Sequence, residues 1–287
     1  MRRLLLVDGT GVAYRCFHAI PSLCSPSGQP TNAVYGFIRM LQALGAAWRP
    51  THWAVAMDGG VPEWRRALWT GYKAERPPMP DGLRAQLPLL DEYLDRARIC
   101  RIRVQGQEAD DVLASLVAQR AEESDETLIA TSDKDLLQLV SAKIAAVSPV
   151  KGGERCGPRE VAERLGVSPG QVVDWLAMAG DSADGIPGVP GIGGKTAAKL
   201  LGQFGSLTQV LERLDEVRPE HLRESLRSHG EELKRNLELV RLDATLDCVP
   251  AWETLARQPE PFDAVVPFYN RLGFHSLTRA AQEVTML

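Results

Sequence analysis

The chain has 287 residues, of which 44% are hydrophobic, 24% charged and 6% aromatic, and its 33 basic and 37 acidic side chains give a formal charge of −4. This composition is typical of a globular protein, no apolar stretch is long enough to cross a bilayer, and the apolar run after the two N-terminal arginines is too short for a secretory signal. These features exclude membrane and exported proteins, and the charge balance taken alone argues weakly against a polyanionic partner.

The five cysteines are odd in number and widely spaced, and no two of them form a CxxC pair. This pattern argues against a disulfide framework and against a zinc site. Reduced thiols of this kind are expected in a cytoplasmic protein.

The first half of the chain alternates short apolar runs with helical patterns, which is typical of an α/β domain with a mostly parallel sheet and flanking helices. The predicted strands are residues 4–8, 52–58 and 128–133, with weaker candidates at 102–104 and 143–147. Helices are predicted at 32–45 and 109–123.

Residues 59–86 break this pattern and have no clean strand or helix period. Basic and aromatic side chains are interleaved there: Trp64, Arg65, Arg66, Trp69, Tyr72, Lys73 and Arg76. Single-stranded nucleic acid is bound by such a combination of cations and stacking surfaces. The alternative is that the aromatic side chains fold back onto the core.

A glycine-rich, charged segment at 148–160 is the predicted domain boundary. The sequence after it is typical of helices up to residue 287. We therefore predict an α/β domain over 1–160 and an all-helical domain over 161–287, with a glycine-rich hairpin at 185–201.

Carboxylates follow the predicted strands. Asp8 ends the first strand, Asp58 the second and Asp133 the third, and ligands of an open parallel sheet bind at this carboxyl edge. Further acids are expected at the same edge: Glu108, Asp110, Asp111 and Asp135. Any one of them could be an ordinary cap, but together they would repel one another unless cations neutralise them. Oxygen ligands without His or Cys favour Mg²⁺ or Mn²⁺.

A second acidic cluster follows the helix that ends near residue 180. Asp181 and Asp184 are three residues apart, so both can face one way. Acids at a helix C-terminus oppose the helix dipole, which favours a functional role over a solvated helix end.

The hairpin at 185–201 does not fit a phosphate-binding P-loop, because Val189 stands where the motif needs its first glycine and no strand precedes it. It fits a helix–hairpin–helix, in which helix N-terminal amides and basic side chains contact DNA phosphates. The residues expected to do so are Gly191, Gly193, Lys195, Thr196 and Lys199. A purely structural hairpin is the alternative.

The net charge of −4 includes the acidic residues of the two candidate metal-binding clusters, and the rest of the chain is basic. Without the nine candidate metal ligands, 28 acidic residues stand against 33 basic ones. The balance therefore does not exclude a DNA partner.

Several motifs occur in a fixed order: LLVDG (5–9), AYR (13–15), AVYGF (33–37), GYKAER (71–76), EADDVLASL (108–116), TSDKDLLQL (131–139) and GIPGVPGIGGKTAAKLL (185–201). Together they resemble the 5′-nuclease family, which includes the N-terminal domain of bacterial DNA polymerase I, phage 5′-exonucleases and, more distantly, the flap endonucleases. The resemblance covers roughly residues 3–260. Gly185 departs from the pattern, because the family usually has Asn there.

The resemblance implies two Mg²⁺ sites. The first would use Asp8, Asp58, Glu108 and Asp110, with Asp111 acting through water, and the second would use Asp133, Asp135, Asp181 and Asp184. It also implies a helical arch over about 63–100 that threads or clamps the 5′ strand and carries Lys73 and Arg76. Arg15, Arg65 and Tyr72 are further expected DNA contacts, and the hairpin loop could bind K⁺.

The resemblance implies a PIN-like or resolvase-like α/β fold and a Mg²⁺-dependent 5′→3′ exonuclease and flap endonuclease, acting on DNA by a two-metal mechanism in replication and repair. Asp8, Asp58, Lys73 and Arg76 are its expected catalytic residues. A catalytically silent DNA-junction binding protein and an RNA-directed nuclease remain alternatives. We expect a stand-alone, monomeric, cytoplasmic and nucleoid-associated protein, with 5′ ends or flaps of DNA and a separate DNA polymerase as partners.

Overall fold

The computed structural model describes residues 1–150 and 153–285. Its strands are β1 (Arg3–Asp8), β2 (His52–Met57), β3 (Cys100–Arg103), β4 (Glu126–Ala130), β5 (Ile144–Val147) and β6 (Arg155–Cys156). They form one sheet in the order β3-β2-β1-β4-β5-β6, in which only the β5–β6 pair is antiparallel. The mostly parallel sheet is confirmed, and the short strand β6 lies inside the segment predicted as a domain boundary.

The α-helices are α1 (Gly9–Ala19), α2 (Asn32–Trp48), α3 (Glu63–Leu68), α4 (Asp81–Arg84), α5 (Leu87–Arg96), α6 (Ala109–Arg120), α7 (Pro158–Leu165), α8 (Val172–Ala179), α9 (Gly194–Phe204), α10 (Leu207–Glu212), α11 (Glu220–Ser228), α12 (Gly230–Val240), α13 (Phe262–Leu272) and α14 (His275–Thr285). A short 3₁₀ helix, η2 (Asp135–Leu139), follows β4. Among the described residues, no helix combines the length and apolar character that a membrane span needs.

The sheet is buried on both faces because β1 is apolar at every position from Leu4 to Val7. Leu5 and Val7 belong to the core shared with α1, α2 and α5, whereas Leu4 and Leu6 belong to the core shared with α6. Side chains alternate between the faces of a strand, so this continuous apolar run covers two cores at once.

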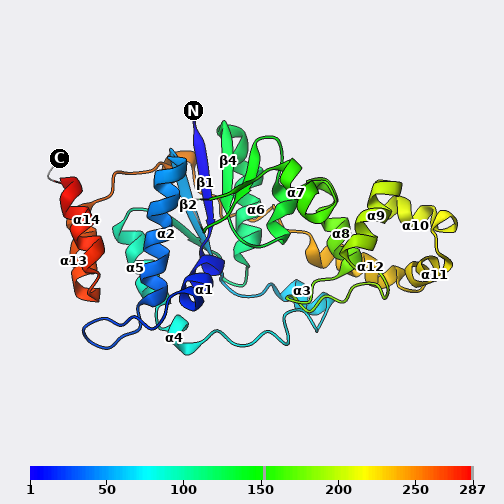
Figure 1. Cartoon of the computed structure of the whole chain (residues 1–287), viewed down its shortest axis with the longest axis horizontal. Helices are drawn as coiled ribbons and strands as arrows, with labels where there is room; N and C mark the ends of the chain where they lie inside the picture. The colour runs from blue at the N-terminus through cyan, green and yellow to red at the C-terminus, as the bar shows by residue number, and fades with distance from the viewer. Residues whose placement is uncertain (151–152, 286–287) are drawn as a thin grey trace.

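The second domain is helical and packs beside β5. Helices α7 to α12 surround a core that also takes in Leu137, Val140 and Ala146 from the α/β domain. Figure 1 shows α9, α10 and α11 at the end of the molecule farthest from α13 and α14. The shared core fixes the helical domain next to the carboxyl edge of the sheet.

The C-terminal helices correct the predicted division of the chain. Helices α13 and α14 lie beside α5 and α2 (Figure 1), and their residues Val265, Phe268 and Leu277 join the α/β core. The helical domain therefore ends before α13. The apolar residues of α13 indicate that it packs onto another part of the chain, but an amphipathic helix does not reveal which surface its apolar face will cover.

The predicted helical arch also differs from the structure. Within residues 63–100, α5 packs into the α/β core, and the stretch from Trp69 to Pro80 contains turns and extended chain but no helix. Figure 1 shows this stretch running from α3 to α4 beneath the carboxyl edge of the sheet.

Candidate active site

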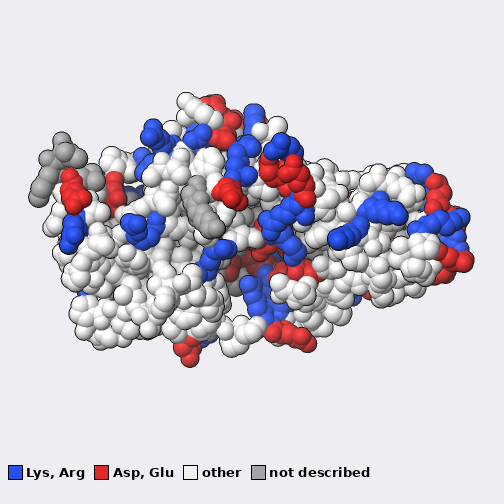
Figure 2. Space-filling model, viewed as in Figure 1, with Lys and Arg blue, Asp and Glu red and all other residues white. Residues whose placement is uncertain are grey.

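An acidic pocket of about 230 Å³ lies at the carboxyl ends of β1, β2 and β4. Because these strands are parallel neighbours, the acids that follow them converge. Figure 2 shows acidic side chains in a recess in the middle of one face, with basic side chains around it. Seven of the predicted acids line the pocket: Asp8, Asp58, Glu108, Asp110, Asp133, Asp181 and Asp184.

Neutral donors hold the two acids that follow β1 and β2. Asp8 caps α1, accepting from the N–H of Gly11 at 2.8 Å, and its other oxygen accepts from the Thr131 hydroxyl at 3.2 Å. Asp58 accepts from the N–H of Ala109, the first residue of α6, at 2.8 Å. Burial raises the pKa of Asp8 to about 6 and also raises the pKa of Asp58. Both carboxylates are thus fixed in direction and poorly solvated.

Glu108 and Asp110, at the start of α6, have contrasting surroundings. Glu108 accepts from Arg65 and from the Tyr72 hydroxyl, both at 2.8 Å, and from Lys73 at 2.7 Å. Burial raises the pKa of Asp110 well above its ordinary value, and the other acids of the pocket raise it further. Glu108 is compensated by cations, whereas Asp110 is opposed mainly by like charges.

Asp111 lies behind the pocket rather than in it. Its carboxylate is fully buried and accepts from both terminal nitrogens of Arg65, at 2.6 and 2.7 Å, and from the N–H of Asp243 at 2.8 Å. Only 1% of the Arg65 side chain is exposed. Two predictions need correction: Arg65 cannot contact DNA in this position, and Asp111 is committed to a buried ion pair instead of a water-mediated metal contact.

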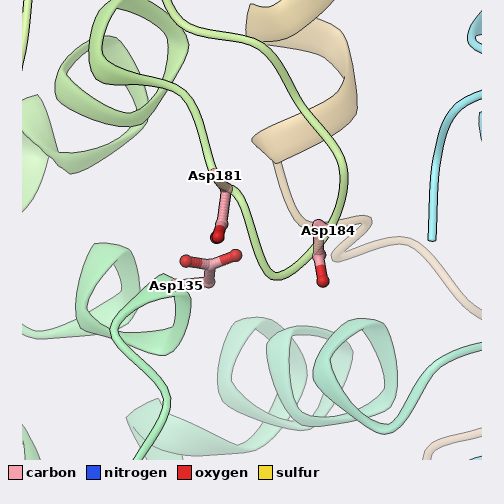
Figure 3. A group of neighbouring side chains, drawn as sticks. All are labelled: Asp135, Asp181 and Asp184. Carbon is pink, nitrogen blue, oxygen red and sulfur yellow. The ribbon is translucent and has the colours of Figure 1, made fainter. Parts of the chain in front are cut away.

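Asp135, Asp181 and Asp184 form a second acidic group. One carboxylate oxygen from each lies within 4.8 Å of the others, and Figure 3 shows Asp181 pointing toward Asp135, with Asp184 on the same loop as Asp181. One oxygen of Asp135 is buried without a hydrogen bond. Burial raises the pKa of Asp135 to about 8, and the charge of Asp133 contributes.

Lys134 was missed as a site residue, although it stands between two predicted acids in TSDKDLLQL. Its ammonium group donates to Asp181 and lies 3.4 Å from Asp135. The neighbouring Asp133 is exposed, lines the acidic pocket and accepts from the N–H of Asp135 at 2.9 Å. A side-chain cation thus already neutralises part of the second acidic group.

Tyr72 and Lys73, in the segment after α3, both contact acids that line the pocket. Tyr72 is buried, and its hydroxyl contacts Glu108 and, at 3.3 Å, Asp184, so it is not the exposed stacking surface that was predicted. The Lys73 ammonium lies 2.7 Å from Glu108 and 3.4 Å from Asp184. Burial lowers the pKa of Lys73, but these two carboxylates raise it above its ordinary value, so Lys73 is charged. Arg76 is exposed and lines the pocket.

Arg15 borders a cleft of about 360 Å³ next to the acidic pocket. It is exposed on α1 and donates to the Ser132 hydroxyl at 2.8 Å. Asp8 and Asp133 line both the cleft and the pocket, so the two spaces are adjacent.

The predicted hairpin residues lie in the helical domain, between α8 and the first turns of α9. Gly191 has a φ of +81°, and Gly193 is the N-cap of α9, whose first turn contains no acid. Lys195 and Lys199 are exposed and Thr196 is partly exposed. These groups are accessible to a ligand and lie outside the acidic pocket.

The donor set of the pocket fits hard divalent cations. Its acidic lining offers carboxylate oxygens, and no described His or Cys lines it. A metal cation would also give a closer partner to the buried Asp135 oxygen, which has no hydrogen bond and lies 3.4 Å from the Lys134 ammonium, and it would offset the crowding of charge that raises the pKa of Asp110. The acids that could hold ions are Asp8, Asp58, Glu108 and Asp110 on one side and Asp133, Asp135, Asp181 and Asp184 on the other.

Two family models match consecutive parts of the chain. The 5′-3′ exonuclease N-terminal resolvase-like domain matches residues 3–166, and the 5′-3′ exonuclease C-terminal SAM fold matches residues 167–262. The 5′-3′ exonuclease of Aquifex aeolicus is 37% identical over 99% of this chain and 96% of its own length. DNA polymerase I of Bacillus caldotenax is 41% identical over 96% of this chain, which spans 32% of that relative's length.

Solved structures share the fold. T5 5′-exonuclease with bound zinc ions is 25% identical, with a TM-score of 0.71 over 84% of this chain and 90% of that one. A bacteriophage T5 flap endonuclease, in a pseudo-enzyme–product complex with DNA and metal ions, is 22% identical, with a TM-score of 0.71 over the whole of both chains.

Proposed function

The chain belongs to the 5′-3′ exonuclease family, and from this premise we propose that it is a structure-specific 5′→3′ exonuclease and flap endonuclease that hydrolyses DNA phosphodiesters with divalent metal ions. The observation that carries the proposal is the acidic pocket, where seven carboxylates meet at the carboxyl edge of the sheet. Carboxylates at this density, with their pKa values raised by burial, are costly unless they bind cations.

Magnesium is the proposed cofactor, with manganese as a substitute. When bound, a pair of such ions activates a water molecule and stabilises the leaving oxygen of a phosphodiester. Asp8 and Asp58 suit the role of ligands because backbone and hydroxyl donors fix their directions before any ion arrives. The T5 5′-exonuclease with bound zinc ions, which has the same fold, supports the use of divalent metals.

Lys73 and Arg76 are the proposed electrostatic catalysts. Lys73 is charged and its ammonium group contacts both Glu108 and Asp184, and Arg76 lines the same pocket. A phosphate that enters the pocket brings negative charge close to both side chains, and that charge grows in the transition state. Neither residue needs to become a covalent nucleophile.

The helical domain is proposed to bind the duplex next to the cleavage site through a helix–hairpin–helix. The N-terminus of α9 and the exposed Lys195 and Lys199 present positive potential without a nearby acid in the first turn. Carbonyl groups of the loop before α9 are a proposed K⁺ site. Arg15, beside the acidic pocket, would contact a backbone phosphate of the cleaved strand.

The remaining proposals concern the setting of the reaction. Cleavage that leaves a 3′-hydroxyl supplies a primer end, so we place the protein with a DNA polymerase in replication and repair. We further propose that it acts as a monomer at the nucleoid, in the cytoplasm.

Cleavage of a 5′-labelled flap duplex in Mg²⁺ and in EDTA, with a binding titration of the same duplex, tests the proposal. We expect Mg²⁺-dependent cutting near the junction. Asp58→Asn should lower the cleavage rate roughly 10³-fold and change DNA binding little, because the amide oxygen can still accept from Ala109. The control Asp263→Asn, at an exposed aspartate of α13, should cleave at the wild-type rate.

Tight flap binding without cleavage in either Mg²⁺ or Mn²⁺ would refute the nuclease proposal and support the silent DNA-junction binder instead. Cleavage of RNA in preference to the DNA flap would favour the RNA-directed alternative.

A further inference from the structure

The second acidic group depends on a loop that belongs to the helical domain. Asp181 and Ile186 exchange backbone hydrogen bonds of 2.8 Å in both directions, which closes a turn over residues 182–185. Asp184 lies in this turn, and its carboxylate must reach across the domain boundary toward Asp135. The direction of the Asp184 side chain therefore depends on what holds the turn, in addition to its direct contacts with Tyr72 and Lys73.

Backbone contacts hold the turn against the segment after α3. The N–H of Lys73 donates to the carbonyl of Asp184 at 2.9 Å, and the indole N–H of Trp69 donates to the carbonyl of Gly185 at 2.9 Å. We call these two hydrogen bonds the Asp184 clasp. They hold the carbonyl groups of Asp184 and of the residue that follows it, so they restrict the backbone that aims the carboxylate.

Gly185 makes the clasp possible. Its φ is +69°, and a Cβ atom at this position would lie 2.4 Å from the carbonyl oxygen of Gly71. A side chain here would push the Trp69–Lys73 segment away from the turn. A glycine therefore lets the two segments approach closely enough for the indole N–H of Trp69 to reach the carbonyl of residue 185.

Trp69 is itself held in place. The guanidinium of Arg235, on α12, lies 4.2 Å from the centre of the indole ring, a stacking distance, and the backbone N–H of Trp69 donates to the carbonyl of Arg65 at 2.9 Å. The indole is thus fixed from the helical domain and from α3 before it donates to Gly185. A bare surface tryptophan would lack both supports.

We propose that Trp69 is a positioning residue of the second acidic group: its indole N–H holds the turn that aims the Asp184 carboxylate at a divalent cation bound with Asp135 and Asp181. The inference rests on the proposed metal-dependent function. Trp69 touches neither the carboxylates nor a reacting atom, and it acts through the backbone of Gly185.

The test compares Trp69→Phe, which keeps an aromatic ring under Arg235 but removes the indole N–H and part of the ring, with Trp252→Phe, a change of the same size far from the pocket, which controls for the lost ring volume. Mn²⁺ binding to the DNA-free protein is followed by titration calorimetry, and hydrogen exchange is followed over residues 181–186. Trp69→Phe should weaken the lower-affinity Mn²⁺ site about fivefold and speed exchange of the turn. Flap cleavage should lose kcat with KM for DNA unchanged, and Trp252→Phe should behave as wild type.

Gly185→Ala opens the clasp from the other side and completes a double-mutant cycle. If the clasp acts as one unit, the double variant should bind Mn²⁺ no more weakly than Gly185→Ala alone. Additive losses, or unchanged Mn²⁺ affinity and unchanged exchange in Trp69→Phe, would overturn the proposal. Mn²⁺ binding and hydrogen exchange can both be measured without catalytic turnover. A wild-type protein that fails to cleave DNA would therefore refute the nuclease function and leave this test of Trp69 intact.

Discussion

The two acidic groups of the pocket are built in different ways. Asp8 and Asp58 sit at the ends of neighbouring strands, and nearby backbone and hydroxyl groups hold them. Asp135 and Asp181 come from different domains, and the ammonium group of Lys134 lies between them. The first group is therefore a product of the sheet, whereas the second exists only when the helical domain is docked.

This difference shows where charge compensation comes from. Strand ends deliver carboxylates in fixed directions at little entropic cost, so neutral donors are enough to orient them. Carboxylates that meet across a domain boundary repel one another during docking, and a cation must offset that repulsion. The same need for a cation appears behind the pocket, where Arg65 neutralises Asp111.

The largest effect is expected from Arg65→Met. The substitution leaves the carboxylate of Asp111 buried without its cation, which should lower the free energy of unfolding by about 3–5 kcal/mol. Urea unfolding of the DNA-free protein measures it. Arg66→Met, at the exposed neighbouring position, should cost about 0.5 kcal/mol or less, and similar losses in the two variants would contradict the buried ion pair.

An intermediate effect is expected from raising the pH from 6 to 8 in EDTA. Burial raises the pKa of Asp8 to about 6 and that of Asp135 to about 8, so the folded chain binds more protons than the unfolded chain as these groups titrate. The stability that depends on these two groups is therefore highest below about pH 4 and falls as pH rises. Between pH 6 and 8 the loss should be about 3 kcal/mol, most of it from Asp135.

Thermal unfolding in EDTA at a series of pH values measures this slope. Saturating Mg²⁺ should flatten it, because metal-bound carboxylates stay ionised across the range. Asp135→Asn should remove most of the loss between pH 6 and 8. A slope that neither Mg²⁺ nor this substitution changes would assign the titration to groups outside the pocket.

The smallest effect is expected from Lys134→Met, which removes the cation from the second acidic group. The metal-free protein should lose about 1 kcal/mol of stability, and Mn²⁺ should bind about three- to tenfold more tightly because a competing positive charge is gone. Lys143→Met, at an exposed lysine paired with Glu122, is the control. Weaker Mn²⁺ binding would mean that Lys134 arranges the acids for the metal instead of competing with it.

Much of the first acidic group could be predicted from residue order. An apolar run that ends in Asp8 forms a buried parallel strand, and parallel strands share their carboxyl edge, so Asp58 had to arrive close by. The predicted helical arch differs from the structure because the local sequence does not show which surface a helix packs against. Residues 87–96 have an amphipathic pattern, and nothing local shows that their apolar face joins the α/β core.

Residue order alone was enough for several local features: strands β1 to β5, helices α2 and α6, and the acids at the strand ends, because these depend on short-range sterics and periodicity. The packing of the two domains was needed to show which charges meet. Arg65 and Arg66 are identical neighbours along the chain, yet one is sealed against Asp111 and the other is exposed. Trp69 and Gly185 lie more than a hundred residues apart, and they meet because the helical domain docks beside β5. The Arg65–Asp111 and Trp69–Gly185 contacts follow from the packing of whole helices and strands. The interaction energy of a charged group or hydrogen-bond donor depends on which partners this packing brings within a few ångströms.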